Sequence, residues 1–115
     1  RDVAPSRGLG DVYKRQKKEY VEKNPLTVLE SVYAVIVDRM NNPKEDSYTN
    51  AVMEKGIDEI LKKLGHECTE IILAAKNPDS DDLKFEISDF MYHCMILMAQ
   101  KNITWAEIAG ELAQR

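Results

Sequence analysis

Turn-forming residues are scarce in this sequence. Its 115 residues include five glycines and four prolines, and this scarcity favours long helices over a many-stranded sheet. Hydrophobic residues make up 43% and charged residues 31% of the chain, as in an ordinary small globular domain, and the length leaves room for a single core. We therefore predict one all-α domain.

Long apolar runs and cysteine motifs are also missing. No run approaches the ~20 apolar residues that span a bilayer, and no export signal is recognisable. Cys68 and Cys94 lack CxxC spacing and fall at apolar positions of helical patterns, which predicts buried free thiols rather than a disulfide or a zinc site. A cytoplasmic protein without membrane contact is therefore expected.

The first sixteen residues, RDVAPSRGLGDVYKRQ, show neither helical nor strand periodicity. Their end, DVYKRQ, is what one reading frame of a common transposon-based sequencing adapter would encode. We therefore interpret residues 1–16 as a non-native leader and residues 17–115 as the domain. Residues 17–115 contain 12 basic and 18 acidic residues, a formal net charge of −6. This acidic balance argues against a nucleic-acid partner and is compatible with metal binding.

Helical periodicity divides the domain into about four to five helices. The first, Thr27 to Asn42, opens with a Thr-x-x-Glu capping signal and stops at NNP. The stretch SYTNAVMEKG predicts one or two helical turns closed by Gly56. A helix of about twenty residues is expected from Ile57, because apolar residues follow at i, i+3 and i+4.

The next helix is predicted from a cap at Asp79 or Ser80 to about Lys101, and a last helix starts at Thr104 with a second Thr-x-x-Glu signal. Two apolar stripes are expected to form the core: Ile57, Ile60, Leu61, Leu64, Cys68, Ile71, Ile72 and Ala75 on one long helix, and Leu83, Ile87, Phe90, Cys94, Leu97 and Met98 on the other. Since the far side of the second long helix is apolar too, a second subunit is expected to help cover it, most simply in a homodimer.

Acidic residues recur at matching places on the two long helices. At about 100° per residue, Glu67 lies at the edge of the first stripe and Glu70 further out. On the second helix Glu86 borders the stripe and Asp89 lies one turn along. Antiparallel packing would bring these four carboxylates together, and like charges partly out of water require a cation. All-oxygen ligands favour magnesium or manganese over zinc. Such pairs are also common as solvated helix edges, and His93 on the same line is more often an interior histidine than a ligand.

Two motifs carry a resemblance to a known family. GHECTE, followed after fifteen residues by EISD, resembles the E-E-x-x-E … E-x-x-D signature of the all-α NTP pyrophosphohydrolases, the MazG-like superfamily. The segments VIVDRMNNPKEDSYTNAVMEKGIDEILKKLGHECTEIILAAKN and FEISDFMYH are more closely similar to the phosphoribosyl-ATP pyrophosphatase family, over roughly Leu26 to Arg115. The resemblance implies a MazG-like bundle that hydrolyses phosphoribosyl-ATP to phosphoribosyl-AMP and pyrophosphate in the second step of histidine biosynthesis, with magnesium or manganese as the cofactor.

The resemblance also implies roles for individual residues. The metal ligands would be Glu67, Glu70, Glu86 and Asp89, and either Glu67 or Glu70 would orient the attacking water. Phosphate contacts are expected from Lys55, Lys62, Lys63 and Lys76, with Lys63 nearest the acids. Contacts to the nucleotide or ribose are expected from Ser47, Tyr48 and Thr49.

Two positions depart from the family pattern. His66 replaces the first acid of E-E-x-x-E, which puts a second metal or the positioning of water in doubt, and Glu59 stands where the family often has a basic residue. Two alternatives therefore remain open: a MazG-like hydrolase acting on other nucleoside triphosphates, and a non-catalytic helical dimer module. The resemblance also allows a phosphoribosyl-AMP cyclohydrolase domain fused upstream, as in bifunctional relatives.

Overall fold

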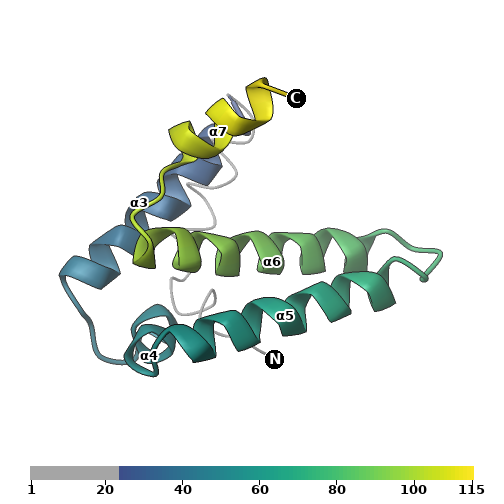
Figure 1. Ribbon diagram of the computed structural model, residues 1–115. Coiled ribbons are helices and arrows are strands. Elements are labelled where there is room, and N and C mark those ends of the chain that lie inside the picture. The colour runs from purple at the N-terminus through teal and green to yellow at the C-terminus, as the bar shows by residue number, and fades with distance from the viewer. Residues whose placement is uncertain (1–23) are drawn as a thin grey trace.

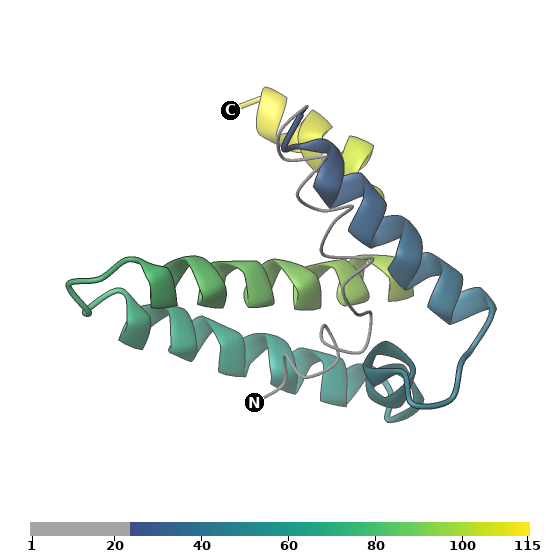
Figure 2. The ribbon, with the colours of Figure 1, turned by 180° about the vertical axis from the view of Figure 1, so that it is seen from behind.

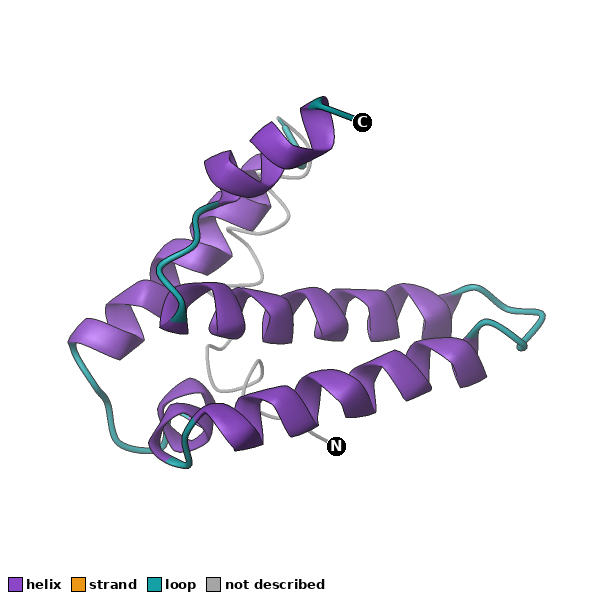
Figure 3. Cartoon of the chain, in the orientation of Figure 1, coloured by secondary structure: helices purple, strands orange, loops and turns teal. Residues whose placement is uncertain are grey.

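The computed structural model describes residues 24–115, and its regular elements there are all helices (Figure 3). In chain order they are α3 (Thr27–Asn41), α4 (Tyr48–Glu54), α5 (Ile57–Ala74), α6 (Asp81–Gln100) and α7 (Trp105–Ala113). The all-α prediction is confirmed for this part of the chain, whereas the predicted leader, residues 1–16, lies outside the described residues. No helix within residues 24–115 combines the length and apolarity needed to cross a bilayer.

Helices α5 and α6 form a long antiparallel hairpin, seen from both sides in Figures 1 and 2. Helix α3 crosses the C-terminal end of α6, α7 runs back beside α3, and the short α4 packs against both α3 and the start of α5. The core lies where α3, α4, α5 and α6 meet. Its buried apolar side chains are Ile36, Val52, Ile60, Met95, Ile96, Met98 and Ala99.

The two predicted capping boxes have different outcomes. At Thr104 the box is complete, because the Thr104 backbone N–H donates to Glu107 Oε1 at 2.8 Å and the Glu107 N–H donates to Thr104 Oγ1 at 3.2 Å. At Thr27 the prediction is wrong, since the N-cap is Leu26 and the Thr27 hydroxyl donates to the Asn24 backbone oxygen at 2.8 Å. Thr27 is already inside the helix, where its side chain cannot act as the cap.

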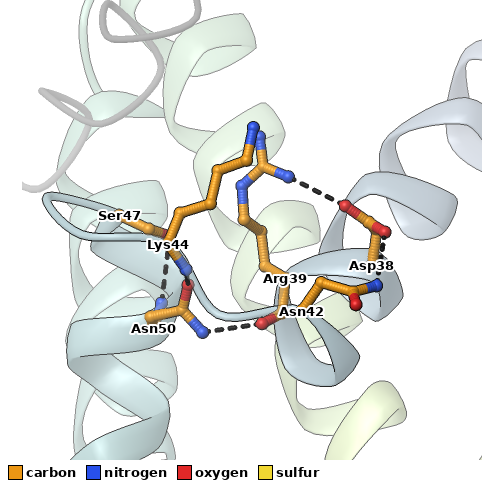
Figure 4. Close-up of polar contacts among 6 residues, drawn as sticks. All are labelled: Asp38, Arg39, Asn42, Lys44, Ser47 and Asn50. Carbon is orange, nitrogen blue, oxygen red and sulfur yellow. Dashed lines mark hydrogen bonds and ion pairs between the residues drawn. The ribbon is translucent and has the colours of Figure 1, made fainter.

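One asparagine holds the connection between α3 and α4. The side chain of Asn50 accepts from the Lys44 backbone N–H at 3.0 Å and donates to the Arg39 backbone oxygen at 2.7 Å (Figure 4). Its own backbone N–H donates to Ser47 Oγ, the cap of α4. These bonds fix the start of α4, which carries Tyr48 and Thr49. After α4 the chain turns at Gly56, whose φ of +94° suits glycine, into α5.

The predicted apolar stripes coincide only in part with the buried lines of the two long helices, at Ile60 of α5 and Met98 of α6. On α5 the buried residues are Ile60, Glu67 and Ala74, whereas Leu61 is 47% and Ile72 62% exposed. On α6, Ile87 is 41% exposed, and the buried positions include all three of Glu86, Asp89 and His93. The acid-bearing lines therefore face the seam between α5 and α6, and much of the apolar stripe lies on the outside of the hairpin.

The exposure of the two cysteines is explained by which helix faces are buried. Both are free thiols, as predicted, but the prediction that both are buried is wrong for Cys68, which is exposed, while Cys94 is half-buried. Cys68 belongs to the outward-facing stripe of α5, because it lies one turn before Ile72 and next to the buried Glu67. Helical spacing alone could not show which face of α5 the same chain covers.

Candidate metal centre in the α5–α6 seam

Three buried side chains with ligand-type atoms meet in the seam between α5 and α6. Glu67 comes from α5, and Asp89 and His93 come from successive turns of α6. One atom of each lies within 4.8 Å of one atom of the other two. Their exposed fractions are 2%, 6% and 1%. Among the described residues, this is the group whose geometry could hold a metal ion.

The Asp89 carboxylate shows why such a site suits a cation. Its Oδ1 lies 3.6 Å from His93 Nδ1, and its buried Oδ2 has no hydrogen-bond partner within residues 24–115. A carboxylate out of water is unfavourable unless it is paired or coordinates a metal. A second carboxylate, that of Glu67, within the same 4.8 Å adds like-charge repulsion, so the donor set fits a divalent cation with oxygen ligands.

The other two predicted ligands lie beside this group. Glu86 is buried and Glu70 is partly exposed, and both line a cleft of about 420 Å³. The cleft is formed by Glu70, Leu73, Ala74, Asn77, Asp82, Phe85 and Glu86. The structure thus places Glu67 and Asp89 inside the seam and Glu70 and Glu86 at an opening near the tip of the hairpin.

Asp82 also lines this cleft, and His66 contacts one of its carboxylates. Asp82 was not predicted, although it precedes Glu86 by one helical turn and could have been found by that spacing. His66 places Nε2 3.5 Å from Glu70 Oε2, and its side chain is 60% exposed. The residue that departs from the family motif therefore contacts a predicted metal ligand at the outer edge of the seam.

Of the four predicted phosphate-binding lysines, Lys63 lies nearest the seam. Its Nζ is 4.0 Å from Glu59 Oε2 and 5.8 Å from the centre of the Tyr48 ring, and Tyr48 in turn contacts His93. Glu59 is therefore an ion-pair partner of the lysine. The other three, Lys55, Lys62 and Lys76, are exposed and form no ion pair within the described residues.

The three predicted hydroxyl groups are engaged within the fold. Ser47 Oγ caps α4, Tyr48 Oη lies 2.8 Å from His93 Nε2, and Thr49 Oγ1 lies 2.6 Å from Tyr92 Oη. Burial raises the pKa of Tyr92, against smaller lowering effects of the Thr49 hydrogen bond and the Arg39 charge, so this phenol keeps its proton near neutral pH. Tyr48 and Thr49 thus join α4 to α6, and Ser47 caps α4, roles that the sequence did not reveal.

Comparisons with known proteins show the family of this chain. A family model described as phosphoribosyl-ATP pyrophosphohydrolase matches residues 29–115. A phosphoribosyl-ATP pyrophosphatase of Clostridium novyi (strain NT) is 51% identical over 90 residues, covering 78% of this chain and 82% of the relative. One from Bacillus cereus (strain AH187) is 47% identical over 93 residues, covering 81% and 84%.

Longer relatives contain the same region. The histidine biosynthesis bifunctional protein HisIE of Caldanaerobacter subterraneus subsp. tengcongensis is 48% identical over 90 residues, which is 78% of this chain but 44% of that protein. The aligned region of the two shorter relatives includes most of their own length. Because the family model spans the five described helices almost entirely, this chain belongs to the phosphoribosyl-ATP pyrophosphohydrolase family.

Proposed function

We propose that this chain hydrolyses phosphoribosyl-ATP to phosphoribosyl-AMP and pyrophosphate in histidine biosynthesis, with Mg²⁺ as the cofactor and Mn²⁺ as a possible substitute. Family membership and the activity for which the relatives are named support the reaction. The observation that carries the proposal is the buried Glu67–Asp89 pair in the seam, beside the Glu70–Glu86 cleft. An acidic site of this kind suits a cation that binds polyphosphate.

Four carboxylates would hold the cation: Glu67, Glu70, Glu86 and Asp89. When bound, it would neutralise negative charge on the phosphoryl group under attack. The buried pair supplies fixed charge in a region from which water is largely excluded, which strengthens its attraction for a cation. Glu70 and Glu86 reach the cleft, where the phosphates of a nucleotide could enter.

The water nucleophile needs a carboxylate that water can reach. Glu67 is 2% exposed, whereas the Glu70 side chain is 27% exposed and lines the cleft. This difference favours Glu70 over Glu67 as the group that orients the attacking water and accepts its proton. Glu67 then serves as a ligand deeper in the seam.

The side chains around the α5–α6 seam indicate which residues could contact the substrate. Lys63, beside the Tyr48 ring, is the foremost candidate for a phosphate contact, and Lys55, Lys62 and Lys76 stay predictions. Direct nucleotide or ribose contacts by Ser47, Tyr48 and Thr49 also stay predictions. Their hydroxyls already have partners within the fold, which favours a role in placing α4.

The outer face of the hairpin supports the proposed homodimer. Leu61, Ile72 and Leu73 on α5 and Phe85 and Ile87 on α6 are between 41% and 62% exposed. Exposed apolar side chains on a helical hairpin are a common site of subunit association. The cytoplasmic location and an upstream cyclohydrolase domain stay predictions, the latter supported by the bifunctional relatives.

Pyrophosphate release provides the test of this function. The rate with phosphoribosyl-ATP is compared with the rates for ATP and a panel of deoxynucleoside triphosphates, each with Mg²⁺ and with a chelator. We expect phosphoribosyl-ATP to be strongly preferred, the chelator to stop turnover, and Asp89→Asn to lose it. Glu111→Gln, which removes an exposed acid on α7, is the control and should retain activity.

The alternatives give different results in the same assay. Faster hydrolysis of plain triphosphates than of phosphoribosyl-ATP would contradict the proposed substrate and favour a MazG-like hydrolase. Absence of turnover with every nucleotide would contradict catalysis and favour a helical dimer module. Turnover unaffected by the chelator would contradict the metal requirement.

A further inference from the structure

A buried hydrogen-bonded path joins α4 to the acidic seam through His93. Tyr48 Oη lies 2.8 Å from His93 Nε2, and His93 Nδ1 lies 2.8 Å from the backbone oxygen of Asp89 and 3.6 Å from its carboxylate Oδ1. The His93 side chain is 1% exposed. The imidazole therefore stands between a short helix and a carboxylate of the metal centre.

The partners of its two nitrogens determine which one carries hydrogen. A carbonyl oxygen can only accept, so Nδ1 carries the hydrogen and donates it to the Asp89 backbone oxygen. In the neutral ring Nε2 then accepts, and the Tyr48 hydroxyl donates to it. The lone pair that a metal would need is thus directed at Tyr48.

Aromatic packing fixes the plane of the same ring. The Tyr48 ring meets His93 edge to face, with centroids 5.7 Å apart and planes at 87°, and the Tyr92 ring does so at 6.0 Å and 78°. Rotation of the imidazole toward Glu67 would break both hydrogen bonds and this packing. A ring held in this way orients its neighbours instead of exchanging partners.

We propose that His93 is a positioning residue and not a metal ligand: through its hydrogen bonds to the Asp89 backbone oxygen and to Tyr48 it ties the turn of α6 that carries Asp89 to α4, with the ring 3.6 Å from the Asp89 carboxylate. The inference rests on the proposed function in taking Asp89 as a metal ligand, but its tests need no substrate. Loss of a partner that orients a metal ligand typically weakens metal affinity by about 10–100-fold. We therefore expect that removing the Tyr48 hydroxyl weakens metal binding without touching a carboxylate.

The first test is the tautomer of His93 in the unaltered protein. The chain has two histidines, and His66→Gln assigns their ¹⁵N signals in long-range ¹H–¹⁵N spectra. We expect hydrogen on Nδ1 of His93 and no metal-bound shift of either ring nitrogen when Mg²⁺ or Cd²⁺ is added. Hydrogen on Nε2 of a neutral ring, or a metal-bound shift with Cd²⁺, would overturn the inference.

The second test is Mn²⁺ affinity measured by calorimetry. Tyr48→Phe and His93→Asn should each bind Mn²⁺ about ten-fold more weakly than the unaltered protein, and the double variant should lose little more, because both act through one path. Tyr33→Phe is the matched control. It removes a phenol hydroxyl that donates at 2.6 Å to the Ile103 backbone oxygen. Because Tyr33 shares no partner with the seam among the described residues, the Mn²⁺ affinity of this variant should stay within about two-fold of that of the unaltered protein.

The outcomes separate this inference from the proposed function. Equal Mn²⁺ affinity of Tyr48→Phe and Tyr33→Phe would overturn the positioning role, even if phosphoribosyl-ATP is hydrolysed. Loss of affinity confined to Tyr48→Phe and His93→Asn would support it, even if no nucleotide is turned over. If His93→Asn fails to fold, Tyr48→Phe and the tautomer of the unaltered protein still decide the question.

Discussion

Replacing Asp89 by asparagine should stabilise the metal-free protein. Asp89 and Glu67 have ligand oxygens within 4.8 Å of each other in a buried seam. At an effective dielectric constant of about 20, two unit charges at that distance repel by about 3.5 kcal/mol. The asparagine removes this repulsion but buries an amide beside an oxygen position without a described hydrogen bond, which costs about 1–3 kcal/mol.

The difference between these terms is the expected effect on stability. We expect the free energy of unfolding to rise by about 1–2 kcal/mol in a chelator, which for a domain of this size raises Tm by roughly 5–10 °C. Magnesium should reverse the stability order, so that the unaltered protein becomes more stable than Asp89→Asn. At a concentration 100 times Kd, bound ligand stabilises the unaltered protein by about 2.7 kcal/mol, whereas the variant has lost a ligand.

The assay is thermal unfolding of both proteins at one protomer concentration, with chelator and with Mg²⁺. Glu111→Gln, an exposed substitution on α7, is the control and should change stability by less than about 0.5 kcal/mol. An Asp89→Asn variant that is less stable than the unaltered protein in chelator would refute the like-charge reasoning. A stability order that Mg²⁺ leaves unchanged would refute the assignment of Asp89 as a ligand.

Three further predictions concern the cleft and the outer face of the hairpin. Glu70→Ala should abolish pyrophosphate release, because it removes a ligand and the carboxylate that water reaches; unchanged turnover at saturating substrate would show that the acids are misassigned. His66→Glu should raise Mg²⁺-dependent turnover, since a carboxylate replaces an imidazole 3.5 Å from Glu70; equal rates would place position 66 outside the working site. Leu61→Asp should convert a dimer to a monomer in sedimentation, because it charges the apolar face; a monomeric unaltered protein at micromolar concentration would contradict the dimer.

Helix positions could be predicted from the sequence because their signals are local. The Thr104–Glu107 capping box and the turn at Gly56 involve residues within one helical turn. The failure at Thr27 has a local cause as well: Asn24 offers a backbone oxygen to the threonine hydroxyl, and the helix begins one residue earlier than the cap signal implied. A capping motif thus predicts that a helix exists more reliably than it predicts the first residue of that helix.

The acids of the seam could be predicted, but their surroundings could not. Glu67 and Asp89 were predicted from helical spacing and family resemblance, because each lies beside the apolar stripe of its own helix. The Tyr48–His93 contact joins residues 45 apart in the sequence and depends on how α4 packs against α6. The buried side of α5 was predicted only in part: Ile60 is buried, but Leu61 and Ile72 are exposed. An apolar stripe that a second subunit could cover has the same periodicity as one that the chain covers itself.

Diffraction from crystals grown with Mn²⁺ tests the central claim most directly, because the anomalous signal locates the ion without any assumption about its ligands. The α5–α6 seam is predicted to contain an ion within coordination distance of the carboxylates of Glu67 and Asp89, with Glu70 and Glu86 completing the protein ligands and His93 still bonded to Tyr48. An anomalous peak elsewhere, or none in the seam at saturating Mn²⁺, would contradict the account.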